Sequence, residues 1–133
     1  MRVVIVGASK IASELAHDLE IEGHEIIVID LEESGFRRLR NAFKGQKIVG
    51  SGTDLEIYKK INFSSEDAFI AATNSDNVNL STAKLIQETF NCKRVGKVIR
   101  DPFRARAFKQ TEKGIGCPII DAANHLKETV IDK

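Results

Sequence analysis

Hydrophobic and polar positions along this chain follow two patterns, and each pattern predicts a different element. Short runs of apolar, often β-branched residues predict buried strands, whereas apolar residues that recur every three or four positions predict amphipathic helices. The predicted strands are residues 2–6, 25–29, 46–49, 67–72, 94–99 and 117–120. The predicted helices are residues 10–22, 33–43, 54–60, 76–91, 102–113 and 122–131.

This alternation predicts an α/β fold, because right-handed crossovers through helices return each strand in the same direction. We expect a Rossmann-like, doubly wound parallel sheet of six strands in the order 3-2-1-4-5-6, with helices on both faces. The strand order reverses between the first and fourth strands, and ligands of such sheets bind at the carboxyl ends of those two strands. Gly7 and the segment after Ala72 are therefore expected to face each other.

The segment VIVGASKIASELA, residues 4–16, joins the first predicted strand to the first predicted helix. Gly7 supplies a tight turn, as in the G-x-G-x-x-G fingerprint, but Ser9 and Ala12 occupy the second and third glycine positions. Ser9 is small and can donate a hydrogen bond to phosphate, and Ala12 still permits close helix packing. Lys10 lies at the helix N-terminus, which favours anions. The segment is either a modified phosphate cradle or only a fold element.

Asp30 ends the second predicted strand, IIVID, and lies 23 positions after Gly7. A carboxylate at this place in a nucleotide-binding sheet accepts hydrogen bonds from ribose hydroxyls. Its charge repels a 2′-phosphate, so NADP is disfavoured. The alternative is that Asp30 only caps the following turn.

Composition narrows the class of protein. The chain has 133 residues, 42% hydrophobic and 29% charged, as expected for one soluble globular domain. No apolar run reaches the roughly 18 residues of a membrane span, and strand-like sequence begins at Val3 without a signal peptide, so we expect a cytoplasmic protein with no direct membrane insertion. Cys92 and Cys117 form no metal-binding or disulfide pattern and are interpreted as free thiols.

Charge is separated along the chain although the net charge is only +1. Residues 13–34 carry eight acidic side chains and no Lys or Arg, and residues 93–113 carry eight basic side chains against two acidic ones. Such a separation can steer an acidic partner, but charged runs are usually solvated faces. Nucleic acid is not an expected partner, because the only aromatic residues in the basic stretch are Phe103 and Phe108, which suit a core face.

Four segments together resemble a known family over the whole chain. They are VIVGASKIASELAHDL, IIVID, GSGT at residues 50–53 and DAFIAATNSDNVNL at residues 67–80. They are similar to the N-terminal nucleotide-binding lobe of Trk/Ktr-type potassium-uptake regulators, the RCK or KTN domain. The AATNSDNVN stretch is the most specific part, because its polar residues exceed what a Rossmann unit needs.

The resemblance implies a cytosolic regulator that binds NAD(H), ATP, ADP or AMP at the switch point of the sheet. It also implies assembly as a homo-oligomer, a dimer or a ring, or with a companion regulatory subunit, and control of a membrane potassium channel or transporter. By this resemblance, the phosphates would contact Gly7, Ser9, Lys10 and Ile11, and the ribose would contact Asp30 and Leu31. The adenine would contact Ser51, Gly52 and Thr53, and Ala72, Thr73 and Asn74 would close the far side of the pocket. Asn74 or Ser75 could instead only cap the next helix.

Three departures from the family pattern affect this site. The usual G-D-A-T is GSGT, so Ser51 replaces the acid that commonly lies beside adenine. The family arginine of the fifth strand falls at Val98, and neighbouring Lys97 and Arg100 are not clear replacements. Ser9 reduces the room for a pyrophosphate. These departures favour an adenine nucleotide with altered preference, a mononucleotide included, or a site that has become a scaffold.

Residues 1–133 are expected to form one nucleotide-binding domain that lacks the family's smaller C-terminal lobe. Apolar residues on the predicted helices exceed what one sheet buries, which favours oligomerisation through these helices. An oxidoreductase is the main alternative class, but Tyr58 lacks the lysine of a Tyr-x-x-x-Lys pair because Asn62 stands there. The three histidines are isolated, so we expect no enzyme. A nucleotide-free assembly subunit is the other alternative.

Overall fold

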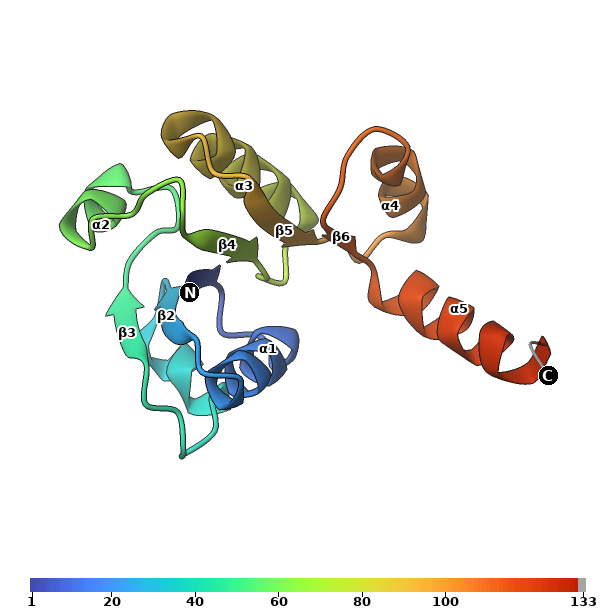
Figure 1. The fold of residues 1–133 in the computed structure, drawn as a ribbon, viewed down its shortest axis with the longest axis horizontal. Coiled ribbons are helices and arrows are strands. Elements are labelled where there is room, and N and C mark those ends of the chain that lie inside the picture. Colours follow the sequence, from blue (N-terminus) through green and yellow to red (C-terminus); the bar gives the residue numbers. More distant parts are fainter. Residues whose placement is uncertain (132–133) are drawn as a thin grey trace.

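The computed structural model describes residues 1–131. Its core is one sheet of six parallel strands in the order β3-β2-β1-β4-β5-β6 (Figure 1), which confirms the predicted strand order. The strands are β1 (Arg2–Val6), β2 (Glu25–Asp30), β3 (Gln46–Val49), β4 (Ala68–Ala71), β5 (Arg94–Val98) and β6 (Ile115–Gly116). The reversal point lies between β1 and β4, as expected.

Helices cover both faces of this sheet (Figure 1). In chain order the helices of the structure are α1 (Lys10–Ile21), the 3-10 helix η1 (Glu33–Arg38), α2 (Leu55–Lys60), α3 (Asp76–Phe90), α4 (Pro102–Lys109) and α5 (Pro118–Ile131), of which α5 does not pack on the sheet. Alternate residues of β1 point to opposite faces. One set packs with Ala12 and Ala16 of α1, and the other packs with Ala83 and Ile86 of α3, so the sheet is buried on both sides.

The predicted strand at residues 117–120 is wrong. Only Ile115 and Gly116 pair with β5, and α5 begins at Pro118. Proline has no N–H for a strand ladder but fits the first turn of a helix. The turn is fixed by Asp121, whose carboxylate accepts the Cys117 N–H at 3.0 Å while its own N–H donates to the Cys117 carbonyl at 2.8 Å.

Two predicted helices are shorter than expected. Residues 33–43 form only η1, because Ser34 and Gly35 are weak helix formers and Gly35 packs closely on Asp30. A Cβ built on Gly35 would lie 2.8 Å from Asp30 Oδ1. The helix predicted at residues 102–113 ends at Lys109, because the chain turns back to β6, where the Lys97 N–H donates to the Gly114 carbonyl at 2.8 Å.

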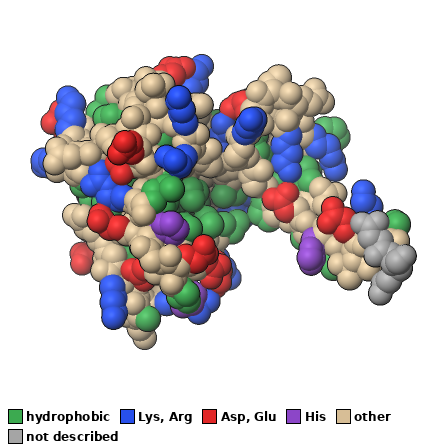
Figure 2. Space-filling view, viewed as in Figure 1, with side chains coloured by type: hydrophobic (Ala, Val, Ile, Leu, Met, Phe, Trp, Pro, Cys, Tyr) green, Lys and Arg blue, Asp and Glu red, His purple; other side chains and the backbone are tan. Residues whose placement is uncertain are grey.

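The last helix, α5, projects away from the body of the domain (Figure 1). None of its residues is buried, and hydrophobic side chains line the angle between α5 and the body (Figure 2). Along α5 an apolar stripe runs through Ile119, Ala123, Leu126 and Val130, and on neighbouring α4 Phe103 is 83% exposed. Among residues 1–131, no helix has the length and hydrophobicity needed to cross a membrane.

Candidate functional site

The crevice at the reversal point is formed by two chain segments in close contact. Gly7 follows β1 with φ +98°, and a Cβ built on it would lie 2.8 Å from the Ala72 carbonyl and from the Thr73 backbone. Only glycine combines this conformation with such close approach. The expected meeting of Gly7 with the segment after Ala72 is confirmed.

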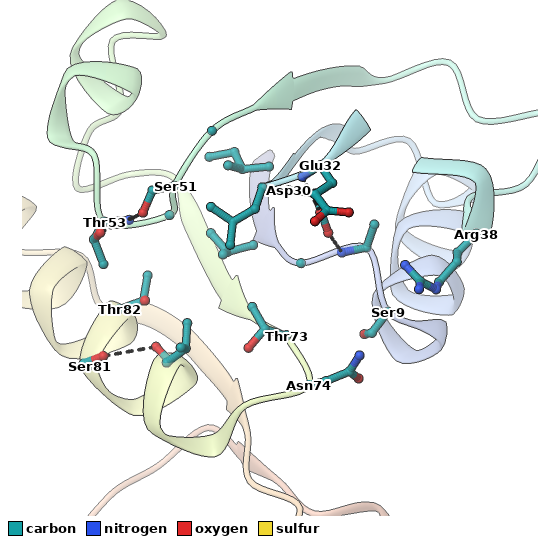
Figure 3. Close-up of a pocket in the computed structure, with 18 residues that line it drawn as sticks. Ser9, Asp30, Glu32, Arg38, Ser51, Thr53, Thr73, Asn74, Ser81 and Thr82 are labelled. Carbon is teal, nitrogen blue, oxygen red and sulfur yellow. Dashed lines mark hydrogen bonds between the residues drawn. The ribbon is translucent and has the colours of Figure 1, made fainter. Parts of the chain in front are cut away.

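A cavity of about 420 Å³ opens at this crevice (Figure 3). The sequence-predicted residues that line it are Gly7, Ser9, Asp30, Leu31, Ser51, Gly52, Thr53, Thr73 and Asn74. Lys10 and Ile11 line a neighbouring hollow of about 230 Å³, and Ala72 is fully buried. Four separate β-to-helix connections thus meet around one space.

Ser9 is buried, and its hydroxyl is used within the protein. It donates to the Ala72 carbonyl at 2.6 Å and accepts the Ala12 N–H at 3.2 Å, which makes it the N-cap of α1. The proton that sequence analysis assigned to a phosphate therefore already has an acceptor. The N–H groups of the first turn of α1 have no partner within the helix, as at any helix N-terminus.

Asp30 caps the turn that follows β2, which is one of the two roles that the sequence left open. Its Oδ1 accepts the Glu32 N–H at 3.0 Å, which caps the turn after β2, and its Oδ2 accepts the Ala8 N–H at 2.9 Å, which holds the glycine turn. A carboxylate offers about four lone-pair positions, so both oxygens can still accept from a ligand. Asp30 and Glu32 point into the cavity (Figure 3).

The loop after β4 is held by Asn79, which is fully buried in α3. Its Oδ1 accepts from the Thr73 N–H at 2.9 Å and from the Thr73 hydroxyl at 2.6 Å. Its Nδ2 donates to the carbonyls of Thr73 at 3.1 Å and Val98 at 2.8 Å. Ser75 caps α3 by accepting the Val78 N–H, so Asn74 is not the cap and its side chain faces the crevice.

Positive charge gathers beside the cavity. Lys10, Arg38 and Arg100 come from three different segments and line the neighbouring hollow. Arg100 Nη2 donates to Asn74 Oδ1 at 3.1 Å, whereas Lys97 is buried in an ion pair with Glu112. Arg100 is therefore the cation of the β5 segment that reaches the crevice.

The other end of the cavity is formed by the loop between β3 and α2. The hydroxyls of Ser51 and Thr53 lie 2.8 Å apart, and Tyr58 donates its hydroxyl proton to the Gly52 carbonyl at 2.7 Å. Burial raises the pKa of Tyr58, which keeps this donor protonated. A Cβ on Gly52 would lie 2.6 Å from Val6 Cγ1, so the loop packs directly on β1.

Sequence reasoning missed several lining residues. Val78, Ser81 and Thr82 belong to one face of α3, and their spacing after Asn74 was a usable signal, because positions i, i+3 and i+4 of a helix are neighbours. Glu32 and Arg38 also line the cavity. No nearby sequence pattern indicated that Arg38 lines the cavity, because the position of its side chain depends on η1 being short.

The fold and the crevice together identify the class of protein to which this chain belongs. A parallel sheet whose glycine turn, strand-end carboxylate and helix N-terminus meet at the reversal point is a Rossmann-type nucleotide-binding fold. Within that class, residues 3–117 match the TrkA-N domain, and the chain belongs to the TrkA-N family.

Sequence relatives agree with this family. The chain is 33% identical over 120 residues to the Trk system potassium uptake protein TrkA of Streptomyces coelicolor, a match that covers 90% of this chain and 52% of that protein. The chain thus spans about half the length of this relative.

Solved structures share the fold. The AMP-bound C-terminal domain of Kef from Shewanella denitrificans has a TM-score of 0.73 and 13% identity, covering 95% of this chain and 77% of that one. The GsuK channel bound to NAD has a TM-score of 0.69 and 18% identity, covering 88% of this chain and 21% of that one.

Proposed function

We propose that this chain binds an adenine nucleotide, NAD(H), ATP, ADP or AMP, in the cavity at the reversal point. The phosphates lie at the start of α1 near Gly7, Ser9, Lys10 and Ile11. The ribose lies against Asp30 and Leu31, and the base reaches the loop of residues 51–53, with Ala72 to Asn74 closing the far side. The observation that carries this proposal is that four separate β-to-helix connections line one cavity. NADP is not expected, because Asp30 and Glu32 oppose a 2′-phosphate.

Size and polarity support this ligand class. A cavity of about 420 Å³ falls within the range of small-molecule sites. Leu31 is 71% exposed and Val78 42% exposed, and both line the cavity. A ring system between them covers apolar surface that is otherwise in water. Two structures with the same fold are described as bound to AMP and to NAD.

The bound nucleotide then acts as a signal. We infer that the domain regulates a membrane potassium channel or transporter as a cytoplasmic partner, which its family membership and its TrkA relative support. The physical mechanism is a population shift, in which the nucleotide favours one arrangement of paired domains and the membrane partner responds. Membership of the TrkA-N family and the TrkA relative favour a regulator over an oxidoreductase.

A nucleotide titration tests the binding proposal. A ligand at 100 times its Kd is expected to raise the free energy of unfolding by about 2.7 kcal/mol. We expect NADH, ATP or AMP to do so in thermal or urea unfolding. The variant Asp30→Asn is expected to weaken nucleotide binding about tenfold. Its amide has one acceptor oxygen, whereas the carboxylate of Asp30 can accept hydrogen bonds from the ribose at two.

Asp54→Asn is the matched control for this titration. Asp54 caps α2 by accepting the Glu56 N–H at 3.1 Å, the same local geometry as Asp30 with Glu32, but it does not line the cavity. Equal affinities of both variants and the parent chain would contradict the ribose contact.

The alternative of a nucleotide-free assembly subunit has one observation in its favour. The side chains of Ser9 and Asp30 are already bonded to backbone groups, so the crevice holds its shape through the protein's own contacts. If saturating NADH, ADP, ATP and AMP leave unfolding unchanged, this alternative replaces the binding proposal.

Self-association through α5 completes the proposed function. Ile119, Ala123, Leu126 and Val130 are spaced 4-3-4, the seam of a paired helix, and Leu126 is 63% exposed. Leu126→Glu is expected to convert a dimer or larger oligomer to monomer, because the seam would then bury a charge. Light scattering measures the mass.

Asn124→Glu is the control for this change. It adds the same charge to the same helix on its opposite side. A wild-type chain that stays monomeric at high concentration would contradict self-association, and so would an oligomer that Leu126→Glu leaves intact.

A further inference from the structure

The two ends of the main cavity differ in charge. Asp30, Glu32 and Arg38 lie on one side, whereas Ser51, Thr53, Ser81 and Thr82 lie on the other (Figure 3). Among residues 1–131, the lining of this second side, here called the base end, includes no charged side chain. A base placed there meets hydroxyl groups.

The hydroxyls at the base end can reverse their hydrogen bonds. Ser51 Oγ and Thr53 Oγ1 are 2.8 Å apart, and either oxygen can be the donor. The Thr53 N–H donates to Ser51 Oγ at 3.2 Å in both cases. Each arrangement leaves one hydroxyl proton of the pair for a ligand, together with lone pairs that can accept from it. The base end therefore offers a donor and an acceptor whose positions are exchangeable.

The hydrogen-bonding edges of the purines are related by the same exchange. Adenine donates from its 6-amino group and accepts at N1, whereas hypoxanthine and guanine accept at O6 and donate from N1. A carboxylate opposite the 6-position only accepts, so it pairs with the 6-amino group of adenine and repels O6 of hypoxanthine and guanine. A reversible pair of hydroxyls satisfies both.

We propose that the base end takes 6-amino and 6-oxo purine nucleotides with similar affinity, and that Ser51 determines this breadth. The proposal rests on the proposed nucleotide-binding function. It extends that function from adenine nucleotides to purine nucleotides as a class.

The test compares ligands that differ only at the 6-position. Affinities for AMP and IMP, and for NAD and its deaminated 6-oxo analogue, are measured by calorimetry with the wild-type chain. We expect the 6-oxo ligand of each bound pair to bind within about threefold of its 6-amino partner. Ser51→Asp is expected to favour the 6-amino ligand by about tenfold, since it replaces a reversible group with a fixed acceptor.

Ser51→Asn is the matched variant, because its amide has the shape of the Asp carboxylate but both donates and accepts. It is expected to keep the wild-type ratio. A wild-type preference of tenfold or more for the 6-amino ligand would overturn the inference while leaving the binding proposal intact, and so would equal ratios for the Asp and Asn variants. Binding of none of the four ligands overturns this inference, and the binding proposal falls with it if NADH, ATP and ADP also fail to bind.

Discussion

Gly7→Ala is expected to lower the free energy of unfolding by about 3 kcal/mol and to abolish nucleotide binding. Two physical effects add at this position. The residue has φ +98°, where a side chain is strained, and its new Cβ would lie 2.8 Å from backbone atoms of Ala72 and Thr73. Backbone cannot move aside as a flexible side chain can, so β1 and β4 must separate at the crevice. Urea unfolding measures the loss of stability, and calorimetry measures binding.

Gly23→Ala separates the two effects. Gly23 has nearly the same conformation, φ +94°, but nothing lies within 4 Å of a Cβ built there. We expect it to lose only about 1 kcal/mol and to keep its nucleotide affinity. Equal losses of stability in the two variants would show that close approach at Gly7 has no effect of its own.

Asn79→Leu is expected to cost about 4 kcal/mol of folding stability. Leucine is similar in size, but it leaves the Thr73 N–H and the Val98 carbonyl without their side-chain partner in a buried place. Each unpaired buried group costs about 1–3 kcal/mol. Because Thr73 lines the cavity, nucleotide affinity is expected to fall as well. Urea unfolding and a nucleotide titration on the same samples measure both effects.

Asn77→Leu is the control on the same helix. Asn77 is exposed, and its side chain accepts only from Arg104 Nη2 at 2.8 Å. A change of less than about 0.5 kcal/mol is expected, as for most surface positions. If both leucine variants are equally stable, the Asn79 bonds do not hold the loop.

The strand order could be predicted because it depends on regular features. Each apolar run is followed by a helix, and right-handed crossovers leave few arrangements for six such units. The last unit was mispredicted because residues 117–120 are apolar apart from Pro118, and an apolar run this short fits a strand or a buried helix turn equally well. The contact of Asp121 with the Cys117 N–H decided between them.

The sequence predicted which segments of the chain line the cavity, but it did not predict the hydrogen bonds that their side chains make. Gly7, Asp30 and Thr73 were located because they follow strands that meet at one edge of the sheet. The use of the Ser9 proton by Ala72 could not be predicted, since these residues are 63 positions apart and their distance depends on the β1–β4 register. Arg38 was missed for a similar reason, because the length of η1 depends on how closely Gly35 approaches Asp30.

Because α5 projects from the domain, a small rotation at its base causes a large displacement of its far end. With 14 residues, α5 is roughly 21 Å long, so a rotation of about 10° at its base displaces the far end by roughly 4 Å. Its base is anchored close to the crevice, because the Cys117 Sγ lies 3.8 Å from the Arg100 carbonyl and Arg100 bonds Asn74. In the proposed function, a nucleotide that rotates this base by about 10° would move the far end of α5 far enough to break or make contacts between subunits.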